Sequence, residues 1–591
     1  MPRSRRERRI PARVAPAQRA VRRRARRLFD RVQPNWWGAV GSIVASWIAL
    51  GPSFLPRRWW TTAASVSLSQ LYGYALGSGA RALRRGAARL LRRRRDARGP
   101  AAAPTPSLPM ATVERTWQTV LLSALTLGSA ATLISALDRQ REIARLVDET
   151  PQTALQQLRG VGAGSAATAA VLGLVSLFRA SSAKTRELIA RVAPALAAPL
   201  SGTAVMFGLT YWLNRSVVWS RLMRRIEATA RANNLRPLPG RTAPEQPERS
   251  GSAASFEPFE SLGRHGKAVA SDGPRAADIA AFWGEPALEP VRAYVGLSAT
   301  LPIEEAAKRA VRELRRAGGF EREHVVIMVG TGTGWVNDWS MAALEFLTRG
   351  DCAVVSLQYT VLPSAFALLL DRRSPKTTGR ALLREVRAEL DRLPEGERPR
   401  LYMTGESLGA FGGLSAFSSS TDLLERLDGA VWAGTPQFSP IWRELVQRRR
   451  PGSPQIRPDI GDGSAIRFSN RPGDALVRHD GAPNAPWGPS RVMFLQHPSD
   501  PVVWWHPSLI WRKPLWMDEP RGYDVTDRMD WWPWVTFWQV SADMPLSLAN
   551  RGGHAHRYFE AYVTAWSEVL GIPVDDPDAV ADAIRPHILP H

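Results

Sequence analysis

Cysteine is almost absent from the sequence, because Cys352 is the only one in 591 residues. This excludes a disulfide within the chain and a metal site built from several thiolates. Lysine is also scarce, with five residues, so arginine carries nearly all of the positive charge. We expect neither a bound metal nor an organic cofactor.

Acidic residues are scarce only in the first third of the chain. Residues 1–225 contain 37 Lys+Arg against 9 Asp+Glu, whereas residues 226–591 contain 41 against 45. The formal net charge of +24 therefore arises from the N-terminal part. We interpret the arginine-rich tail, residues 1–34, as a solvated anchor against anionic lipid. Nucleic-acid binding is the lesser alternative, because the tail lacks the interleaved aromatic residues of a base-stacking surface.

Charged residues are missing from five longer stretches, at about 36–56, 59–80, 116–137, 160–178 and 192–213. A helix needs about 20 apolar residues to cross a bilayer. Tryptophans stand near the ends of several of these stretches, where an amphipathic ring contacts both water and lipid. We therefore predict about five transmembrane helices in residues 35–225, after a basic cytoplasmic tail at residues 1–34. No cleavable signal peptide is expected, because a long charged segment precedes the first apolar run.

The charged residues between these stretches predict how the helices are oriented in the membrane. Segments 1–34, 81–115 and 179–191 are rich in arginine, and the segments between them are poor or balanced. This alternation predicts a cytoplasmic N-terminus, and five crossings would then place the rest of the chain outside the cytoplasm. Four arginines shortly after the last stretch favour the opposite side (Arg215, Arg221, Arg224 and Arg225). The side therefore depends on the exact number of crossings.

Residues 226–275 are rich in polar residues, Pro, Gly and Ser, and we predict a flexible linker there. Beyond it, residues 276–591 alternate between short apolar runs and helix-like stretches. The runs are 291–297, 324–330, 352–359, 400–405, 429–434 and 491–496; the helix-like stretches include 303–316, 375–393 and 408–418. Strands that are apolar on both faces and joined by helices predict a mainly parallel sheet with helices on both faces.

The sequence Gly405-Glu406-Ser407-Leu408-Gly409 lies between one of these strands and a helix. This G-x-S-x-G pattern in that context is typical of a nucleophilic serine on a sharp turn, where glycines avoid steric collisions. A plain turn serine is the alternative, because the bare motif also occurs by chance. We predict that Ser407 is a nucleophile.

A nucleophilic serine needs a base and an acid that orients the base. Asp500 follows the strand at 491–496, and His554 and His556 lie in a Gly-rich loop before a C-terminal helix. These residues occur in the chain order serine, acid, histidine. Either histidine fits as the base, and His554 is slightly favoured because it directly follows two glycines. His497, His506 and Asp474 are competitors.

An oxyanion hole requires backbone N–H groups near the nucleophile. We predict that Leu408 supplies one, and that the glycine-rich loop at 329–338 supplies another from Thr331, Gly332 or Thr333. A dinucleotide-binding loop is the weaker reading, because the glycines follow G-x-G-x-G rather than G-x-G-x-x-G.

Several sequence words carry a resemblance to a known family. They are SLGRHGKAV (261–269), TGTGWVND, SLQYTVLPS (356–364), TGESLGAFGG, AGTPQFSPIW (433–442), HPSDPVVWW and GGHAHRY. Together they resemble the actinobacterial membrane-anchored alpha/beta-hydrolase family, in which a multi-span region precedes a catalytic domain. The resemblance implies an alpha/beta-hydrolase fold, with Ser407, Asp500 and the His554/His556 pair at the motif positions. The family word usually has Gly between the two histidines, and here Ala555 stands there. Some relatives remove amino acids from aminoacylated phosphatidylglycerol, and the resemblance suggests such a substrate.

A tryptophan-rich segment, residues 504–538, follows the expected acid. It is interpreted either as core and cap packing or as an amphipathic cap that rests on the membrane and admits a lipid ester. We expect Tyr359, Gln437, Trp504 and Trp505 to line the substrate pocket. The leading hypothesis is a membrane-anchored serine esterase that acts on a lipid or lipophilic ester; a transacylase and a noncatalytic membrane scaffold are the alternatives. Protein partners are not predicted.

Overall fold

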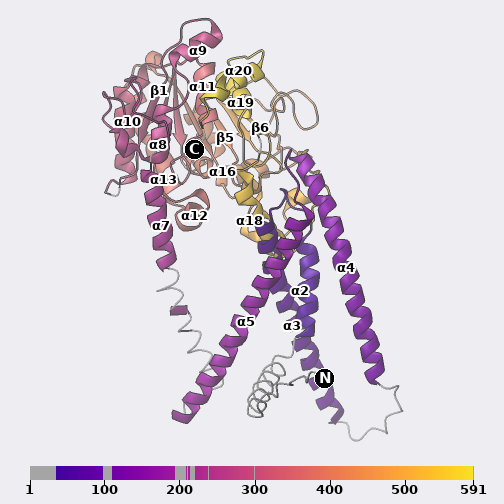
Figure 1. Ribbon diagram of the computed structural model, residues 1–591. Coiled ribbons are helices and arrows are strands. Elements are labelled where there is room, and N and C mark those ends of the chain that lie inside the picture. Colours follow the sequence, from indigo (N-terminus) through magenta and orange to yellow (C-terminus); the bar gives the residue numbers. More distant parts are fainter. Residues whose placement is uncertain are drawn as a thin grey trace, which may run out of the picture. The chain divides into compact units, whose positions relative to one another are not determined.

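The computed structural model describes residues 35–96, 110–192, 208, 211–212, 220–236, 238–298, 300–550 and 552–589. These residues form two compact units. The first contains the described residues within Met1–Leu50 and Val66–Ile134, and the second those within Gly51–Ser65 and Ser135–His591. Five α-helices of the described residues lie in the N-terminal part (Figure 1). They are α2 (Trp36–Ala49), α3 (Trp59–Asp96), α4 (Met110–Leu146), α5 (Ala154–Val192) and α7 (Ser220–Leu235). Of these, α3, α4 and α5 are long.

Glycines let α2 and α3 pack closely in the first unit. A Cβ on Gly41 would lie 2.1 Å from the carbonyl oxygen of Gly73, and a Cβ on Gly77 would lie 2.0 Å from that of Trp37. Only residues without a side chain permit this approach, which is the pattern of close helix pairs. Trp47 Nε1 also donates to Ser129 Oγ of α4 at 3.0 Å.

Two helices in the described residues are long and apolar enough to cross a membrane, Thr119–Leu146 and Ala154–Thr185. Only 11% of the most apolar part of each is buried by the protein, so neither is a core helix. The prediction of about five spans is therefore corrected to two candidates. The first predicted stretch forms only the 14-residue α2, and the second belongs to α3, which contains too many polar residues. The stretch 192–213 lies almost entirely outside the described residues.

A seven-stranded sheet forms the centre of the second unit, and all its neighbouring strands are parallel. The order is β1-β3-β2-β4-β5-β7-β6. The strands are β1 (Val291–Val295), β2 (His324–Val329), β3 (Cys352–Leu357), β4 (Arg400–Glu406), β5 (Gly429–Ala433), β6 (Ile466–Ser469) and β7 (Arg491–Leu495). The predicted parallel α/β sheet is confirmed. Edge strand β6 was not predicted, because its four residues show no apolar run.

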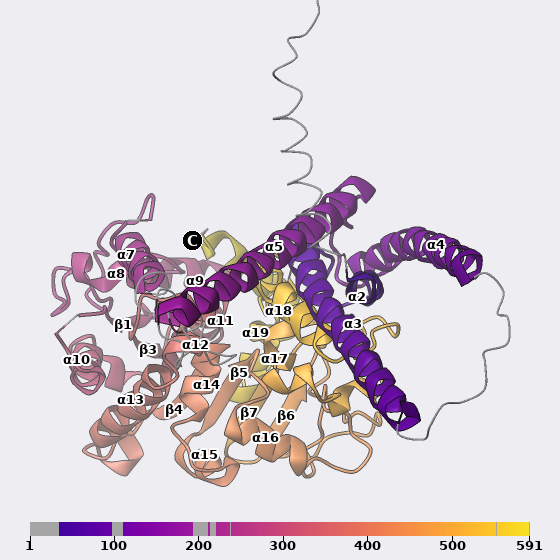
Figure 2. The same ribbon diagram turned by 90° about the horizontal axis from the view of Figure 1, so that it is seen from below.

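Helices cover both faces of this sheet (Figure 2). Alternate residues of each strand face opposite sides. Thus Val325 and Ile327 of β2 join one core cluster, while Val326 and Met328 join the other. The α-helices of this unit that follow α7 in the sequence are α8 (Gly263–Ser271), α9 (Ala276–Trp283), α10 (Ile303–Arg316), α11 (Asp338–Leu347), α12 (Ser364–Leu370), α13 (Ser374–Leu390), α14 (Leu408–Leu414), α15 (Ser420–Arg426), α16 (Pro440–Gln447), α17 (Pro501–Trp504), α18 (Val535–Ser547), α19 (Ala561–Leu570) and α20 (Pro577–Ile584).

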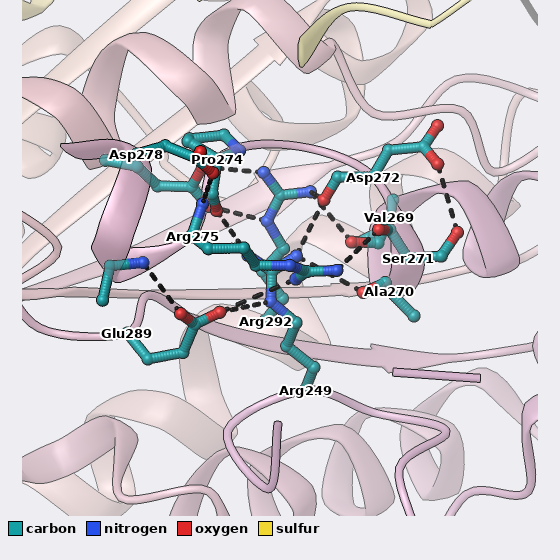
Figure 3. Close-up of polar contacts among 12 residues, drawn as sticks. Arg249, Val269, Ala270, Ser271, Asp272, Pro274, Arg275, Asp278, Glu289 and Arg292 are labelled. Carbon is teal, nitrogen blue, oxygen red and sulfur yellow. Dashed lines mark hydrogen bonds and ion pairs between the residues drawn. The ribbon is translucent and has the colours of Figure 1, made fainter. Parts of the chain in front are cut away.

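Two buried arginines fix the residues expected to form a flexible linker (Figure 3). Arg249 donates to the carbonyl oxygens of Asp272 and Pro274, both at 2.7 Å, and to Glu289. Arg292 of β1 donates to the carbonyl oxygens of Val269 and Asp272, at 2.9 and 3.0 Å, and to the carboxylate of Glu345. Buried guanidinium groups persist only when their donors are satisfied. Within the described part of 226–275, residues 249, 269, 272 and 274 are therefore held at the sheet edge formed by β1.

The segment between α2 and α3 also belongs to the second unit. Phe54 and Leu55 are buried in the same core cluster as the strands. Asp543 of α18 accepts hydrogen bonds from Ser53 Oγ at 3.2 Å and from the Phe54 N–H at 3.0 Å. The unit that contains the sheet thus includes residues 51–65 as well as the strands.

Candidate active site

Ser407 occupies a sharp turn between β4 and α14. Its φ of 57° and ψ of −118° are strained for a residue with a side chain. A Cβ on Gly405 would lie 2.5 Å from the carbonyl carbon of Gly409, and a Cβ on Gly409 would lie 2.1 Å from the carbonyl oxygen of Val329. Only glycine fits at these two positions. The turn therefore has the strand-turn-helix geometry that presents a nucleophile.

Asp500 and His556 form a buried pair. Asp500 caps α17, because its Oδ1 accepts a hydrogen bond from the Val502 N–H at 2.8 Å. Its Oδ2 accepts hydrogen bonds from His556 Nδ1 and from Tyr558 Oη, both at 2.6 Å. Burial alone would raise the pKa of Asp500, but the charge of His556 and these hydrogen bonds lower it. Burial alone would lower the pKa of His556, but Asp500 and then Glu406 raise it. This carboxylate orients the imidazole and stabilises its protonated form.

The ring of His556 lies beside the turn that carries Ser407. A Cβ on Gly434 would lie 2.3 Å from Cε1 of His556, and Gly434 directly follows β5, the strand next to β4. The N–H of Ser407 donates to the carbonyl oxygen of Ala433, the last residue of β5, at 3.0 Å. Nε2 of His556 is buried and has no hydrogen-bond partner among the residues that the structure describes. This nitrogen is the atom that could accept a proton.

His554 contacts a different carboxylate. Its Nδ1 lies 3.2 Å from Asp524 Oδ2, which also accepts from Ser499 Oγ at 2.6 Å. Ser499 in turn accepts the N–H of Ala555 at 2.9 Å. Ala555, between the two histidines, has a φ of 52°, which explains why glycine suits this position. Of the two predicted candidates, the structure thus brings His556 to Asp500 and His554 to Asp524.

The other competitors have local partners. His497 Nδ1 lies 2.8 Å from the carbonyl oxygen of Ala555, and its ring stacks on Tyr558. His506 Nδ1 lies 2.7 Å from Ser508 Oγ. Asp474 accepts from Arg457 at 3.0 Å. These contacts hold loops in place and do not involve Ser407.

The glycine-rich loop after β2 lies next to the serine turn, because Gly409 touches Val329 at the end of β2. The N–H of Thr331 already donates to the carbonyl oxygen of Trp335 at 2.8 Å. Gly332 and Thr333 therefore remain as the predicted donors from this loop. Leu408 is the first residue of α14, where backbone N–H groups lack partners within the helix. The loop and the helix start thus meet at the carboxyl ends of adjacent strands, where α/β sheets usually bind ligands.

The four residues expected to line the pocket differ in position. Trp504 is fully buried, and its ring centroid lies 6.1 Å from that of Trp442 and 5.5 Å from that of Trp516, so it belongs to the core. Trp505 is almost buried and donates from Nε1 to Ser541 Oγ at 2.8 Å. Gln437 binds the backbone of Trp504.

Tyr359 is the fourth of these residues. It is buried, and its hydroxyl finds no hydrogen-bond partner in the described part of the chain. Burial raises the pKa of this hydroxyl well above its ordinary value.

Sequence reasoning missed Glu406 and Tyr558 as parts of the site. Both lie inside sequence motifs noted above, TGESLGAFGG and GGHAHRY. The sequence alone does not show that their side chains are buried beside His556. In the described residues, no group of three or more His, Cys, Asp or Glu side chains could hold a metal ion.

Comparisons with known proteins identify the family of the chain. A model of the alpha/beta-hydrolase family matches residues 291–582, and a model of the N-terminus of the same family matches residues 50–274. No curated protein matches. A solved structure from work on two metagenome-derived lipolytic enzymes is 19% identical over 23% of this chain and 51% of its own, so the match spans about half of that protein. Its TM-score of 0.14 is too low to support any argument.

Proposed function

Because the chain belongs to the alpha/beta-hydrolase family, with its N-terminal region as well as its catalytic domain, we propose that it is a serine hydrolase. We propose further that it cleaves an ester of a lipid or lipid-like substrate through an acyl-enzyme on Ser407. The observation that carries this proposal is the strained turn at Ser407 beside the buried Asp500–His556 pair.

The mechanism follows from the roles of these groups. His556 Nε2 accepts the proton of Ser407 Oγ as that oxygen attacks the ester carbonyl, and Asp500 stabilises the imidazolium. The N–H of Leu408 and an N–H from Gly332 or Thr333 stabilise the negative oxygen of the tetrahedral intermediate. His556 then donates its proton to the leaving alcohol. His556 then deprotonates a water molecule, which attacks the acyl-enzyme carbonyl; the C–O bond to Ser407 breaks, the acid is released, and His556 returns the proton to Ser407 Oγ.

Two features support a lipid substrate. Large apolar side chains of the tryptophan-rich segment are exposed, among them Trp511 and Trp532, with 66% and 48% of their surface accessible. Exposed aromatic side chains on one segment are typical of contact with a membrane or another apolar surface. We propose that α4 and α5 attach the protein to a membrane, because each contains a long apolar stretch that the protein does not bury.

Labelling with a fluorophosphonate probe tests the nucleophile. The probe phosphonylates an activated serine, with formation of an O–P bond and loss of fluoride. The full-length protein in membranes should be labelled, and Ser407→Ala should not. Ser415→Ala is the matched control, since Ser415 is a buried serine at the other end of the same helix and donates to the carbonyl oxygen of Phe411.

Each outcome has a separate meaning. Labelling that persists in Ser407→Ala would place the nucleophile elsewhere. Absence of labelling in a folded native protein would contradict the hydrolase function. If Ser407 alone accounts for labelling, release of acid from lipid esters in mixed micelles identifies the substrate class.

A further inference from the structure

A second buried carboxylate, Glu406, directly precedes Ser407. Its Oε1 lies 3.9 Å from Nε2 of His556, and both side chains are almost fully buried. Its Oε2 accepts from Asn337 Nδ2 at 2.6 Å and from Tyr562 Oη at 3.0 Å. Three separate elements, the end of β4, the N-cap of α11 and α19, thus hold this carboxylate in one orientation.

The mechanism described above gives Glu406 no task. A buried carboxylate is costly unless it is paired or hydrogen-bonded. In the described part of the chain, no Lys or Arg forms an ion pair with Glu406, and His556 is the one basic side chain within 4.0 Å. The two donors on Oε2 favour the ionised form, so Oε1 can direct its charge toward the histidine.

We propose that Glu406 is a positioning residue for His556: its carboxylate holds the imidazole from the side opposite Asp500 and stabilises the imidazolium formed when Ser407 attacks. This inference rests on the proposed function. In the step concerned, the Ser407 O–H bond breaks, its oxygen bonds to the ester carbonyl carbon, and the proton forms an N–H bond at His556 Nε2. Glu406 remains ionised throughout and exchanges no proton.

The charged and titratable groups around His556 are consistent with this role. Asp500 faces Nδ1 from the loop after β7, Tyr558 also donates to Asp500, and Glu406 faces Nε2 from β4. Asp500 and Glu406 both raise the pKa of His556 against the effect of burial. The pKa of Glu406 is raised overall, chiefly by burial and in part by Asp500, although His556, Tyr562 and Asn337 lower it. Arg557 is a further cation in this region, since the charge of Glu406 raises the pKa of its guanidinium against the larger effect of burial.

The Glu406→Gln substitution removes the charge and keeps the size of the side chain. An imidazole must be unprotonated to act as a base, so the rate of labelling falls as the pH falls through the pKa of His556. Glu406→Gln removes a negative charge about 4 Å from Nε2 of His556, and this should lower the pKa of His556 by about one unit or more. The acid limb of the labelling rate should therefore move to lower pH by about one unit. The rate on the high-pH plateau should fall by up to about tenfold, because the imidazolium is less stabilised.

The experiment measures the rate of fluorophosphonate labelling of the full-length protein from about pH 5 to pH 9. Glu444→Gln is the matched control, because Glu444 is a carboxylate of the same domain that binds Ser420 and does not contact His556. Its profile should equal that of the native protein. Tyr562→Phe is a second variant, which removes one donor from Glu406 without changing the formal charge, and it should move the acid limb in the same direction by a smaller amount.

The outcomes separate this inference from the proposed function. A folded native protein that is not labelled at any pH contradicts the hydrolase function itself. A labelled Glu406→Gln protein whose acid limb coincides with that of the native protein overturns the role of Glu406 and leaves the hydrolase function intact. If Glu406→Gln does not fold, an acid limb of Tyr562→Phe that is unchanged from the native one overturns the role as well.

Discussion

His554 and His556 are two residues apart in the sequence but contact different carboxylates. His556 contacts Asp500, and His554 contacts Asp524, which also binds Ser499. The left-handed backbone at Ala555 turns the two side chains to different sides. The slight preference for His554 rested on the two preceding glycines, and the geometry instead favours His556 as the base in the proposed mechanism.

Substitution of each histidine by alanine should therefore have very different effects. His556→Ala removes the proposed base and should lower the labelling rate by about 10²–10⁴-fold. His554→Ala removes one contact that supports the loop and should lower it by less than about tenfold. Labelling rates of the two full-length variants under one set of conditions measure this difference. Equal losses would contradict the assignment of His556.

At the scale of elements, the segment between α2 and α3 is attached to α18 by a buried carboxylate. Asp543 accepts from Ser53 and Phe54, and burial raises its pKa from 3.8 to about 7, although the nearby Arg57 opposes the change. The folded protein therefore keeps a proton on Asp543 between about pH 4 and pH 7, where the unfolded chain has released it. The contribution of Asp543 to the free energy of unfolding therefore falls as the pH rises through this range, and it is constant at higher pH.

Asp543→Asn should remove this pH dependence, because the amide does not ionise. Between pH 5 and pH 8 the native protein should lose about 2–3 kcal/mol relative to the variant. Unfolding temperatures of both proteins in detergent at the two pH values give the comparison, and other titrating groups cancel in the difference. Ser53→Ala serves as the control, since it weakens the same contact but leaves Asp543 free to ionise. If the unfolding temperatures of the native protein and of Asp543→Asn change equally between the two pH values, the raised pKa of Asp543 is contradicted.

For the whole molecule, the core of the hydrolase unit extends into the N-terminal part of the chain. Phe54 is buried in the main core cluster, and its ring centroid lies 5.4 Å from that of Trp516. Trp516 contacts Trp504, the last residue of the short helix that Asp500 caps. A fragment that begins at residue 226 would therefore lack part of this core, next to the helix that Asp500 caps.

Phe54→Ala in the full-length protein should lower the free energy of unfolding by about 3–5 kcal/mol, as expected for a large buried aromatic side chain. The control is Phe256→Ala, because 66% of the surface of Phe256 is exposed and little packing is lost. Denaturant unfolding followed by tryptophan fluorescence measures both variants. Similar small changes for the two substitutions would show that the N-terminal segment does not contribute to this core.

The sequence by itself determined the features that depend on neighbouring residues. Six of the seven strands were predicted because each is a short apolar run, and the turn at Ser407 was predicted because its glycines lie within two residues of the serine. The family was predicted from the joint occurrence of several words, and the comparisons confirm it as the alpha/beta-hydrolase family with its N-terminal region. The count of five spans was wrong for the described residues, because absence of charge does not make a Ser- and Gly-rich stretch apolar enough.

Only the tertiary structure decided which residues meet across long separations. Asp500 and His556 are 56 positions apart, Glu406 and Tyr562 are 156 apart, and Ser53 and Asp543 are 490 apart. Such contacts depend on how helices pack on the two faces of the sheet, and no local pattern encodes them. The choice of histidine, the burial of Glu406 beside it and the inclusion of residues 51–65 in the hydrolase unit all follow from that packing.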